Sequence, residues 1–237
     1  MMNANKLILL IALLTNLLST CVMADILKFD KGLRTADPSA RVWQDGKVTI
    51  YTSHDLECQK DFHMQDWMAF SSTDMVNWQN HGAILSLDDI SWADNYAWAP
   101  DAAYKNGKYY LFFPAGTGFK DRVNPEKSTK WMGIGVAVSI FIDNDGQGYL
   151  YFHGKNFDYY VAKMSDDLLS LEGDFIKMDM GGYEPKMEGP WIFKNGDNYY
   201  FTMPENNRIL SYYMSKSPTG PWTYKGVFME QEHQSNN

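Results

Sequence analysis

Three carboxylates in this chain of 237 residues stand in short motifs of one kind, each next to an aromatic-rich strand candidate. The motifs are Ala36-Asp37-Pro38-Ser39, Trp98-Ala99-Pro100-Asp101 and Glu188-Gly189-Pro190-Trp191. Two carboxyl groups of opposite protonation can cleave a glycosidic bond with inversion when they lie about 6.5–9.5 Å apart, one protonating the leaving oxygen and the other activating water. We expect Asp37 to be the ionised base and Glu188 the acid of such a pair.

The elements that must position these side chains are short strands joined by tight turns. Hairpin turns are indicated at Asp45-Gly46, Asn106-Gly107, Asp145-Gly146 and Asn195-Gly196, and each precedes an aromatic strand candidate. The turns recur at intervals of roughly 50 residues, within the range of propeller blades. The sequence therefore predicts an all-β fold of the β-propeller kind, in which repeated units direct side chains toward a common axis.

The repeat is incomplete in two places. A third-strand candidate at 135–139 runs directly into the next unit at Ile140-Phe141, and the chain ends in the polar segment 231–237 without a strand pattern. We therefore expect about four blades.

The net charge of −8 is spread along the chain without a basic stripe, and 15% of the residues are aromatic. This composition argues against nucleic acid as a partner and suits a neutral, ring-shaped ligand. The His residues show no metal-ligand spacing, so no metal site is predicted.

The N-terminal segment has the pattern of a signal peptide. Lys6 precedes the apolar run 7–14, and small residues follow near Ala24. We expect residues 1–24 to be removed, a single domain over 25–237, and a secreted or periplasmic protein. Lipidation at Cys21 is the alternative for the same segment. No stretch reaches the roughly 20 apolar residues of a membrane span.

Taken in order along the chain, the motifs resemble glycoside hydrolase family 43. The segments that carry the resemblance are Ala36 to Arg41, Tyr51 to Asp55, Ser71 to Trp78, Trp98 to Asp101 with Lys105 to Tyr110, and Glu188 to Trp191. The resemblance implies a five-bladed β-propeller that inverts β-xylosides and α-L-arabinofuranosides of plant cell-wall polysaccharides. It implies Asp37 as general base, Glu188 as general acid and Asp101 in a wall of the sugar pocket.

Two departures from the family pattern accompany the resemblance. The family carries a third acid just before a segment like Phe141 to Gly146, whereas Ser139-Ile140 occupies that junction here. The fifth blade, where the family places a histidine near a central ion or water, is also expected to be missing, and the third blade to be shortened. We expect no cofactor, although the resemblance leaves a central calcium ion open.

Aromatic residues beside the acids complete the predicted site. Trp98 and Trp191 are candidates to stack on a sugar face, and His54 is a candidate to line the pocket. The expected partner is a pentose-containing oligosaccharide or polysaccharide. Two alternatives stay open: a catalytically impaired sugar-binding propeller or non-folding fragment, and a propeller used for protein contact.

Overall fold

The structure, a computed structural model, describes residues 32–55, 64–117, 131–133, 138–154, 158–183, 187–205 and 209–230. Within these ranges the chain forms β-strands and one 3₁₀ turn, η1 (Leu87–Asp89), which confirms the all-β class. No helix in this part of the chain is long and apolar enough to cross a membrane. The predicted signal segment, Cys21 and the polar segment 231–237 lie outside the described residues.

The first and fourth blades are four-stranded antiparallel sheets with long strands. In the first blade the strands lie side by side in the order β1 (Thr35–Val42), β2 (Val48–Asp55), β3 (Met64–Ser72) and β4 (Gln79–Ser86). In the fourth they are β13 (Trp191–Asn195), β14 (Asn198–Glu205), β15 (Ile209–Ser215) and β16 (Thr223–Met229).

The two middle blades are smaller. The third contains β9 (Val138–Ile142), β10 (Gly148–His153), β11 (Tyr159–Lys163) and the two-residue β12 (Ile176–Lys177), so the expected shortening of this blade is confirmed. The second is represented by two pairs, β5 (Asp101–Lys105) with β6 (Lys108–Phe112), and β7 (Ala115–Thr117) with β8 (Trp131–Gly133).

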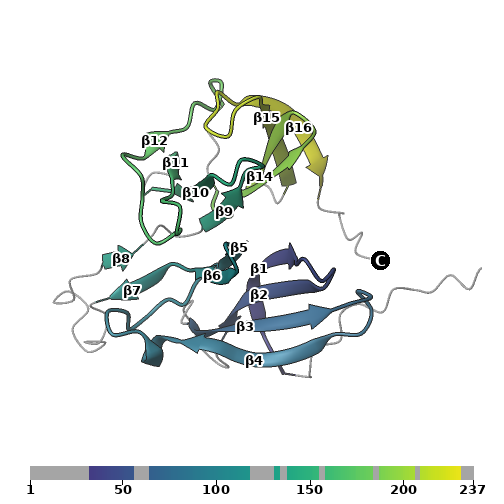
Figure 1. The fold of residues 1–237 in the computed structure, drawn as a ribbon, viewed down its shortest axis with the longest axis vertical. Coiled ribbons are helices and arrows are strands. Elements are labelled where there is room, and N and C mark those ends of the chain that lie inside the picture. Colours follow the sequence, from purple (N-terminus) through teal and green to yellow (C-terminus); the bar gives the residue numbers. More distant parts are fainter. Residues whose placement is uncertain are drawn as a thin grey trace, which may run out of the picture.

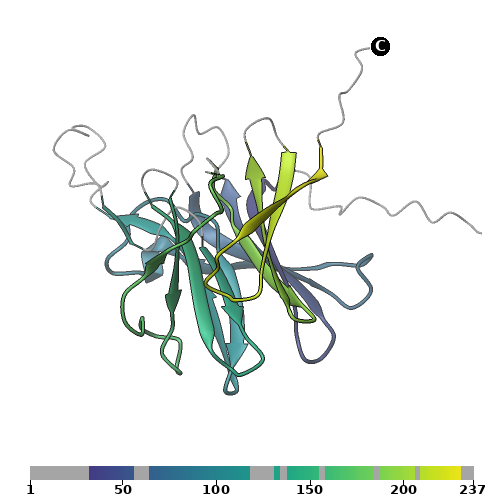
Figure 2. The ribbon, with the colours of Figure 1, turned by 90° about the horizontal axis from the view of Figure 1, so that it is seen from above.

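All four predicted turns connect the first two strands of a blade. Asn106 and Gly107 both have positive φ, of 52° and 78°, which is the conformation that an Asn-Gly hairpin turn adopts. Gly46 and Gly146 also have positive φ, and each amide donates to a carbonyl three residues earlier. The first strand of each blade begins at one end of the molecule, and the turn that follows it lies at the opposite end (Figure 2).

The blades follow one another around a central axis, and the first strand of each blade lies next to that axis. β1 packs against β5, β5 against β9 and β9 against β13, while the sheet β1–β4 and the sheet β13–β16 occupy opposite halves of the molecule (Figure 1). Buried side chains fill the spaces between blades; the largest cluster, around Tyr151, Phe201 and Trp222, joins the third and fourth. The four-blade expectation thus holds for the part of the chain that the structure describes.

One face of the fourth blade carries a row of aromatic rings away from this core. Phe193 stacks on Tyr200 with centroids 4.9 Å apart, and Tyr212 lies between Tyr200 and Phe228. Phe193 is 40% and Phe228 51% exposed. No other sheet within the described ranges covers these two ends of the row.

A buried carboxylate joins the first three blades. Asp101, at the start of β5, is 1% exposed and accepts hydrogen bonds from Ser39 Oγ at 2.5 Å, Arg41 Nε at 2.9 Å and the amide of Ile140 at 2.7 Å. A second Arg41 nitrogen, Nη2, donates to the other carboxylate oxygen of Asp101, so the contact is a bidentate ion pair. Because Ser39 and Arg41 lie on β1 and Ile140 on β9, this one side chain fixes three inner strands relative to one another.

Arg41 extends the same network to the fourth blade. Its guanidinium lies 4.4 Å from the centroid of the Trp191 ring, a cation–π contact with the first residue of β13. Its Nη2 also donates to the carbonyl of Ile140 at 2.8 Å. Asp101 and Arg41 therefore connect all four inner strands.

A second ionic contact joins the third blade to the fourth and involves neither of the other two blades. Lys194 Nζ lies 2.6 Å from Asp143 Oδ1 and donates to the Tyr199 hydroxyl at 2.9 Å, and Tyr199 in turn donates to Asp143. Burial alone would raise the pKa of Asp143, but the hydrogen bonds from Lys194 and Tyr199 outweigh it and lower the pKa.

We predict that Asp101→Asn lowers the free energy of unfolding by about 3 kcal/mol or more, because it leaves the Arg41 charge without its buried partner. Urea denaturation measures the loss. Asp166→Asn is the matched control: Asp166 pairs with Lys105 at 2.9 Å but is 88% exposed, so its loss should stay below about 1 kcal/mol. Equal effects of the two substitutions would contradict the role given to Asp101.

Candidate active site

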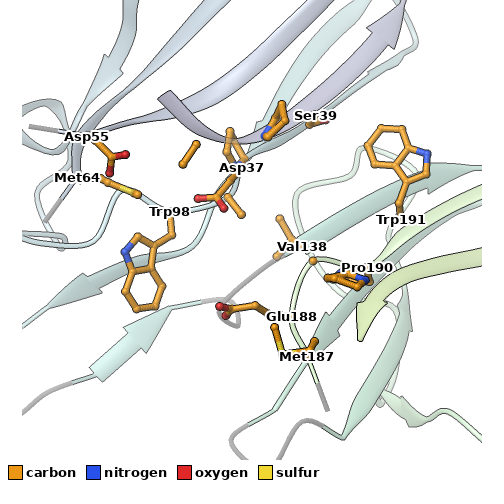
Figure 3. Close-up of a pocket in the computed structure, with 16 residues that line it drawn as sticks. Asp37, Ser39, Asp55, Met64, Trp98, Val138, Met187, Glu188, Pro190 and Trp191 are labelled. Carbon is orange, nitrogen blue, oxygen red and sulfur yellow. The ribbon is translucent and has the colours of Figure 1, made fainter. Parts of the chain in front are cut away.

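A cavity of about 610 Å³ opens where the first strands of the blades begin (Figure 3). All four blades contribute to its wall. Asp37 and Asp55 come from the first, Trp98 and Pro100 from the approach to the second, Val138 from the third and Glu188 from the approach to the fourth. The volume lies within the range of small-molecule binding sites.

Asp37 is aimed into this cavity by an irregularity of β1. The pairing of β1 with β2 shifts register between Ala36 and Ser39, and Asp37 itself has a φ of 52°. Asp tolerates this left-handed conformation better than most residues, and bulges beside active sites redirect side chains. The hydroxyl of Ser53, on β2, donates to Asp37 Oδ2 at 2.8 Å and holds the carboxylate in place.

The surroundings of Asp37 raise its pKa above the usual value. The largest cause is desolvation by the cavity walls, and the negative charges of Glu188 and Asp55 add to it. The hydrogen bond from Ser53 acts in the opposite direction. The influence of Glu188 on Asp37 shows that the two predicted catalytic carboxylates share one electrostatic environment.

Glu188 reaches the cavity from the opposite wall, on the turn that leads into β13 (Figure 3). Gly189 follows it with a φ of 88°, a conformation that favours glycine. The hydroxyl of Tyr159, on β11, donates to the carbonyl of Met187 and so fixes the backbone just before Glu188. The side chain of Glu188 is 54% exposed, which leaves it accessible to a ligand.

Both predicted tryptophans line the cavity. The indole of Trp98 lies beside Asp37 and Glu188, and Trp191 lies on the far side of the cavity (Figure 3). The backbone of Trp98 is held by the indole N–H of Trp67, which donates to its carbonyl at 2.7 Å. The guanidinium of Arg41 packs on the ring of Trp191.

Two predicted pocket residues lie elsewhere. Asp101 is not part of the cavity wall, because its carboxylate is buried and used by Ser39, Arg41 and Ile140. His54 is also outside the wall: its Nδ1 lies 2.9 Å from Asp66 Oδ1. The structure thus places both side chains outside the cavity wall, and a sugar contact by either residue stays a prediction.

Sequence reasoning missed Asp55 and Ser53, two residues of β2 that act on Asp37. They stand on either side of His54, whose ring contacts Asp66 instead. Ser53 contacts Asp37, and Asp55 lines the cavity. Both residues belong to the segment Tyr51 to Asp55, one of those that carry the family resemblance, and this was the available signal.

The junction where the family pattern has a third acid, and where none was expected in this chain, contributes an apolar wall. Val138 lines the cavity at the start of β9, Ser139 is buried and the Ile140 amide is bound to Asp101. Among the described lining residues the carboxylates are Asp37, Asp55 and Glu188. Within the same described part of the chain, no three His, Cys, Asp or Glu side chains are grouped to hold a metal ion.

A propeller whose axial cavity holds facing carboxylates beside aromatic rings has the architecture of a sugar-cleaving enzyme. Comparison with known sequences gives the family. Residues 32–237 match the family described as glycosyl hydrolases family 43, and the chain belongs to it.

Individual relatives agree with this assignment. A xylosidase/arabinosidase of Bacteroides ovatus is 28% identical over 82% of this chain and 78% of that protein. The crystal structure of a GH43_1 enzyme from Xanthomonas citri superposes with a TM-score of 0.72 at 28% identity, covering 84% of this chain and 75% of the other. A β-xylosidase/α-arabinofuranosidase from a compost metagenome, solved with xylotriose, has a TM-score of 0.69 at 28% identity over 84% and 79% of the two chains.

We predict that two substitutions shift the pKa of Asp37 in opposite directions. Asp55→Asn removes a nearby negative charge and should lower it, whereas Ser53→Ala removes a stabilising hydrogen bond and should raise it. Carbon-13 NMR titration of side-chain carboxyl groups measures both, with the Asp37→Asn spectrum assigning the signal. Shifts of the same sign would refute this account of the site.

Proposed function

We propose that this protein is an inverting glycosidase that hydrolyses β-xylosides and α-L-arabinofuranosides of plant cell-wall polysaccharides. The observation that carries the proposal is the position of Asp37 and Glu188 on facing walls of one cavity, with their charges coupled. Membership of glycosyl hydrolase family 43 and the names of the similar enzymes support the substrate class.

In this reaction Glu188 donates its proton to the leaving oxygen while Asp37 removes a proton from the attacking water. The exposed side chain of Glu188 suits the first task, because it can reach a leaving group that extends into solvent. The hydroxyl of Ser53 orients Asp37 for the second. Water attacks from the face of the ring opposite the leaving group, so the anomeric configuration inverts.

The walls of the cavity fit a sugar ring. The indole of Trp98 offers an aromatic face beside the carboxylates, and Pro100, Val138 and Pro190 supply apolar surface. Aromatic and aliphatic faces of this kind contact the C–H surface of a pyranose or furanose, while the carboxylates contact its hydroxyl groups. We propose a xylo-oligosaccharide or arabinose-substituted chain as the ligand, acted on outside the cytoplasm as the predicted signal peptide implies.

A second candidate is a sugar-binding propeller without turnover. Val138, which lines the cavity at the junction where the family places its third acid, is the observation that favours it. Titration calorimetry with xylotriose separates the two candidates: heat of binding without release of xylose supports the second, and release of xylose supports the first.

We predict that Asp37→Asn lowers kcat/KM on 4-nitrophenyl β-D-xyloside, and that Glu188→Gln lowers kcat/KM on methyl β-D-xyloside, each by about 10²–10⁴-fold, the contribution of a general base or acid. Asn is the appropriate replacement at position 37 because it also tolerates a positive φ. Thermal unfolding checks that both variants fold. Proton NMR of the wild-type reaction should show α-xylose as the first product. Unchanged turnover in either variant would remove that residue from the mechanism.

The pH dependence follows from the raised pKa of Asp37. The base is active when ionised, so kcat/KM should fall as the pH drops through a value above the ordinary 3.8 of an Asp side chain. Asp55→Asn lowers this pKa and should move the acid limb of the pH profile to lower pH. An acid limb that stays in place in Asp55→Asn would contradict the assignment of Asp37 as base.

A further inference from the structure

His153 is a buried histidine in the wall behind Glu188. It ends β10 of the third blade, is 3% exposed, and its Nε2 lies 3.7 Å from Glu188 Oε2. Nothing in its sequence context distinguished it from a packing residue. The contact joins the third blade to the acid that precedes the fourth.

The hydrogen bond on the other ring nitrogen defines what Nε2 can do. His153 Nδ1 lies 3.1 Å from the carbonyl oxygen of Gly154, which only accepts, so Nδ1 carries a hydrogen. In the neutral ring Nε2 is then an acceptor, and it faces a carboxyl group that must carry a proton in order to act as an acid. Hydrogen bonds of catalytic groups are commonly long in the free enzyme and shorten when substrate binds.

The same pair of strands also fixes the backbone of Glu188. Tyr159 is the β11 partner of His153, and the two rings lie 6.1 Å apart. Burial, with a contribution from the charge of Glu188, raises the pKa of Tyr159, so its hydroxyl stays protonated and donates to the Met187 carbonyl. β10 and β11 therefore hold both the main chain before Glu188 and its carboxyl group.

We propose that His153 is a positioning residue for Glu188: in the free enzyme its neutral Nε2 accepts a hydrogen bond from the protonated carboxyl group, and so fixes the position from which that group turns its proton to the leaving oxygen. The inference rests on the proposed hydrolytic function. In this chain the third blade then supports the acid through an imidazole on β10, while the start of β9 presents Val138 to the cavity.

Two other titratable groups act on this pair. Tyr159 faces both residues from β11, and Asp37 interacts with Glu188 across the cavity from β1. Tyr159 stays neutral near pH 7, so it does not compete for the proton. Asp37 is ionised when it acts as base, and the negative charge of Glu188 contributes to the raised pKa of Asp37.

The test compares two xylosides that differ in their need for an acid. Methyl β-D-xyloside has a poor leaving group that must be protonated, whereas 2,4-dinitrophenyl β-D-xyloside releases a stable anion without help. His153→Phe should lower kcat/KM on the methyl xyloside by about 10-fold or more, a fraction of full acid catalysis, and leave the dinitrophenyl xyloside within about twofold of wild type.

The conservative variant and the pH profile add independent measurements. The amide oxygen of His153→Gln can accept the same hydrogen bond and should restore most of the activity on the methyl xyloside. An accepted hydrogen bond favours the protonated acid, so its loss in His153→Phe should move the basic limb of kcat/KM to lower pH, while Gln leaves the limb in place. In a Glu188→Gln background, His153→Phe should have little further effect.

His81→Phe is the matched control, because His81 contacts Ser71 on the first blade and does not line the cavity. An equal loss on both xylosides in folded His153→Phe, or a loss that Gln does not restore, would overturn the inference. If the wild-type protein cleaves neither xyloside, the proposed function itself fails. If His153→Phe does not fold, His153→Gln and the double variant decide the question.

Discussion

The ion pair between Asp101 and Arg41 is the contact on which the arrangement of the blades depends. A carboxylate that is 1% exposed is tolerated only when its lone pairs are satisfied, and here β1 and β9 supply the donors. Arg41 carries the connection to Trp191 at the start of β13. In a propeller each blade contacts only its neighbours, so a charged network at the axis relates strands that the sheets themselves do not join.

The geometry of the cavity follows from that network. Asp37 stands two residues before Ser39 and four before Arg41 on the same strand, and Glu188 stands three residues before Trp191. Both catalytic candidates are therefore short extensions of residues that the network fixes. Ser53 orients Asp37. Tyr159 binds the backbone just before Glu188, and His153 lies beside the Glu188 carboxyl group. The chemistry is supported by side chains from β2, β10 and β11, although the carboxylates precede or begin the inner strands.

The sequence was sufficient for the turns, for the blades and for placing Asp37 and Glu188 at one cavity, because Asn-Gly and Asp-Gly turns have a local physical cause and the acidic motifs repeat with them. It was insufficient for Asp101 and His54. A carboxylate at the start of a strand can point to the cavity or into the core, and the choice for Asp101 depends on Arg41, 60 residues away. His153 and Glu188 meet only because the third and fourth blades pack together, which no local pattern records.

The contact of Asp143 with Lys194 and Tyr199 has a consequence for behaviour in acid. These bonds hold the ionised form of Asp143, so they stabilise the folded protein above the ordinary value of 3.8 and are lost as the pH falls through the lower pKa of the folded state. Strong acid thus weakens the contact between the third blade, which carries His153, and the fourth blade, which Glu188 precedes.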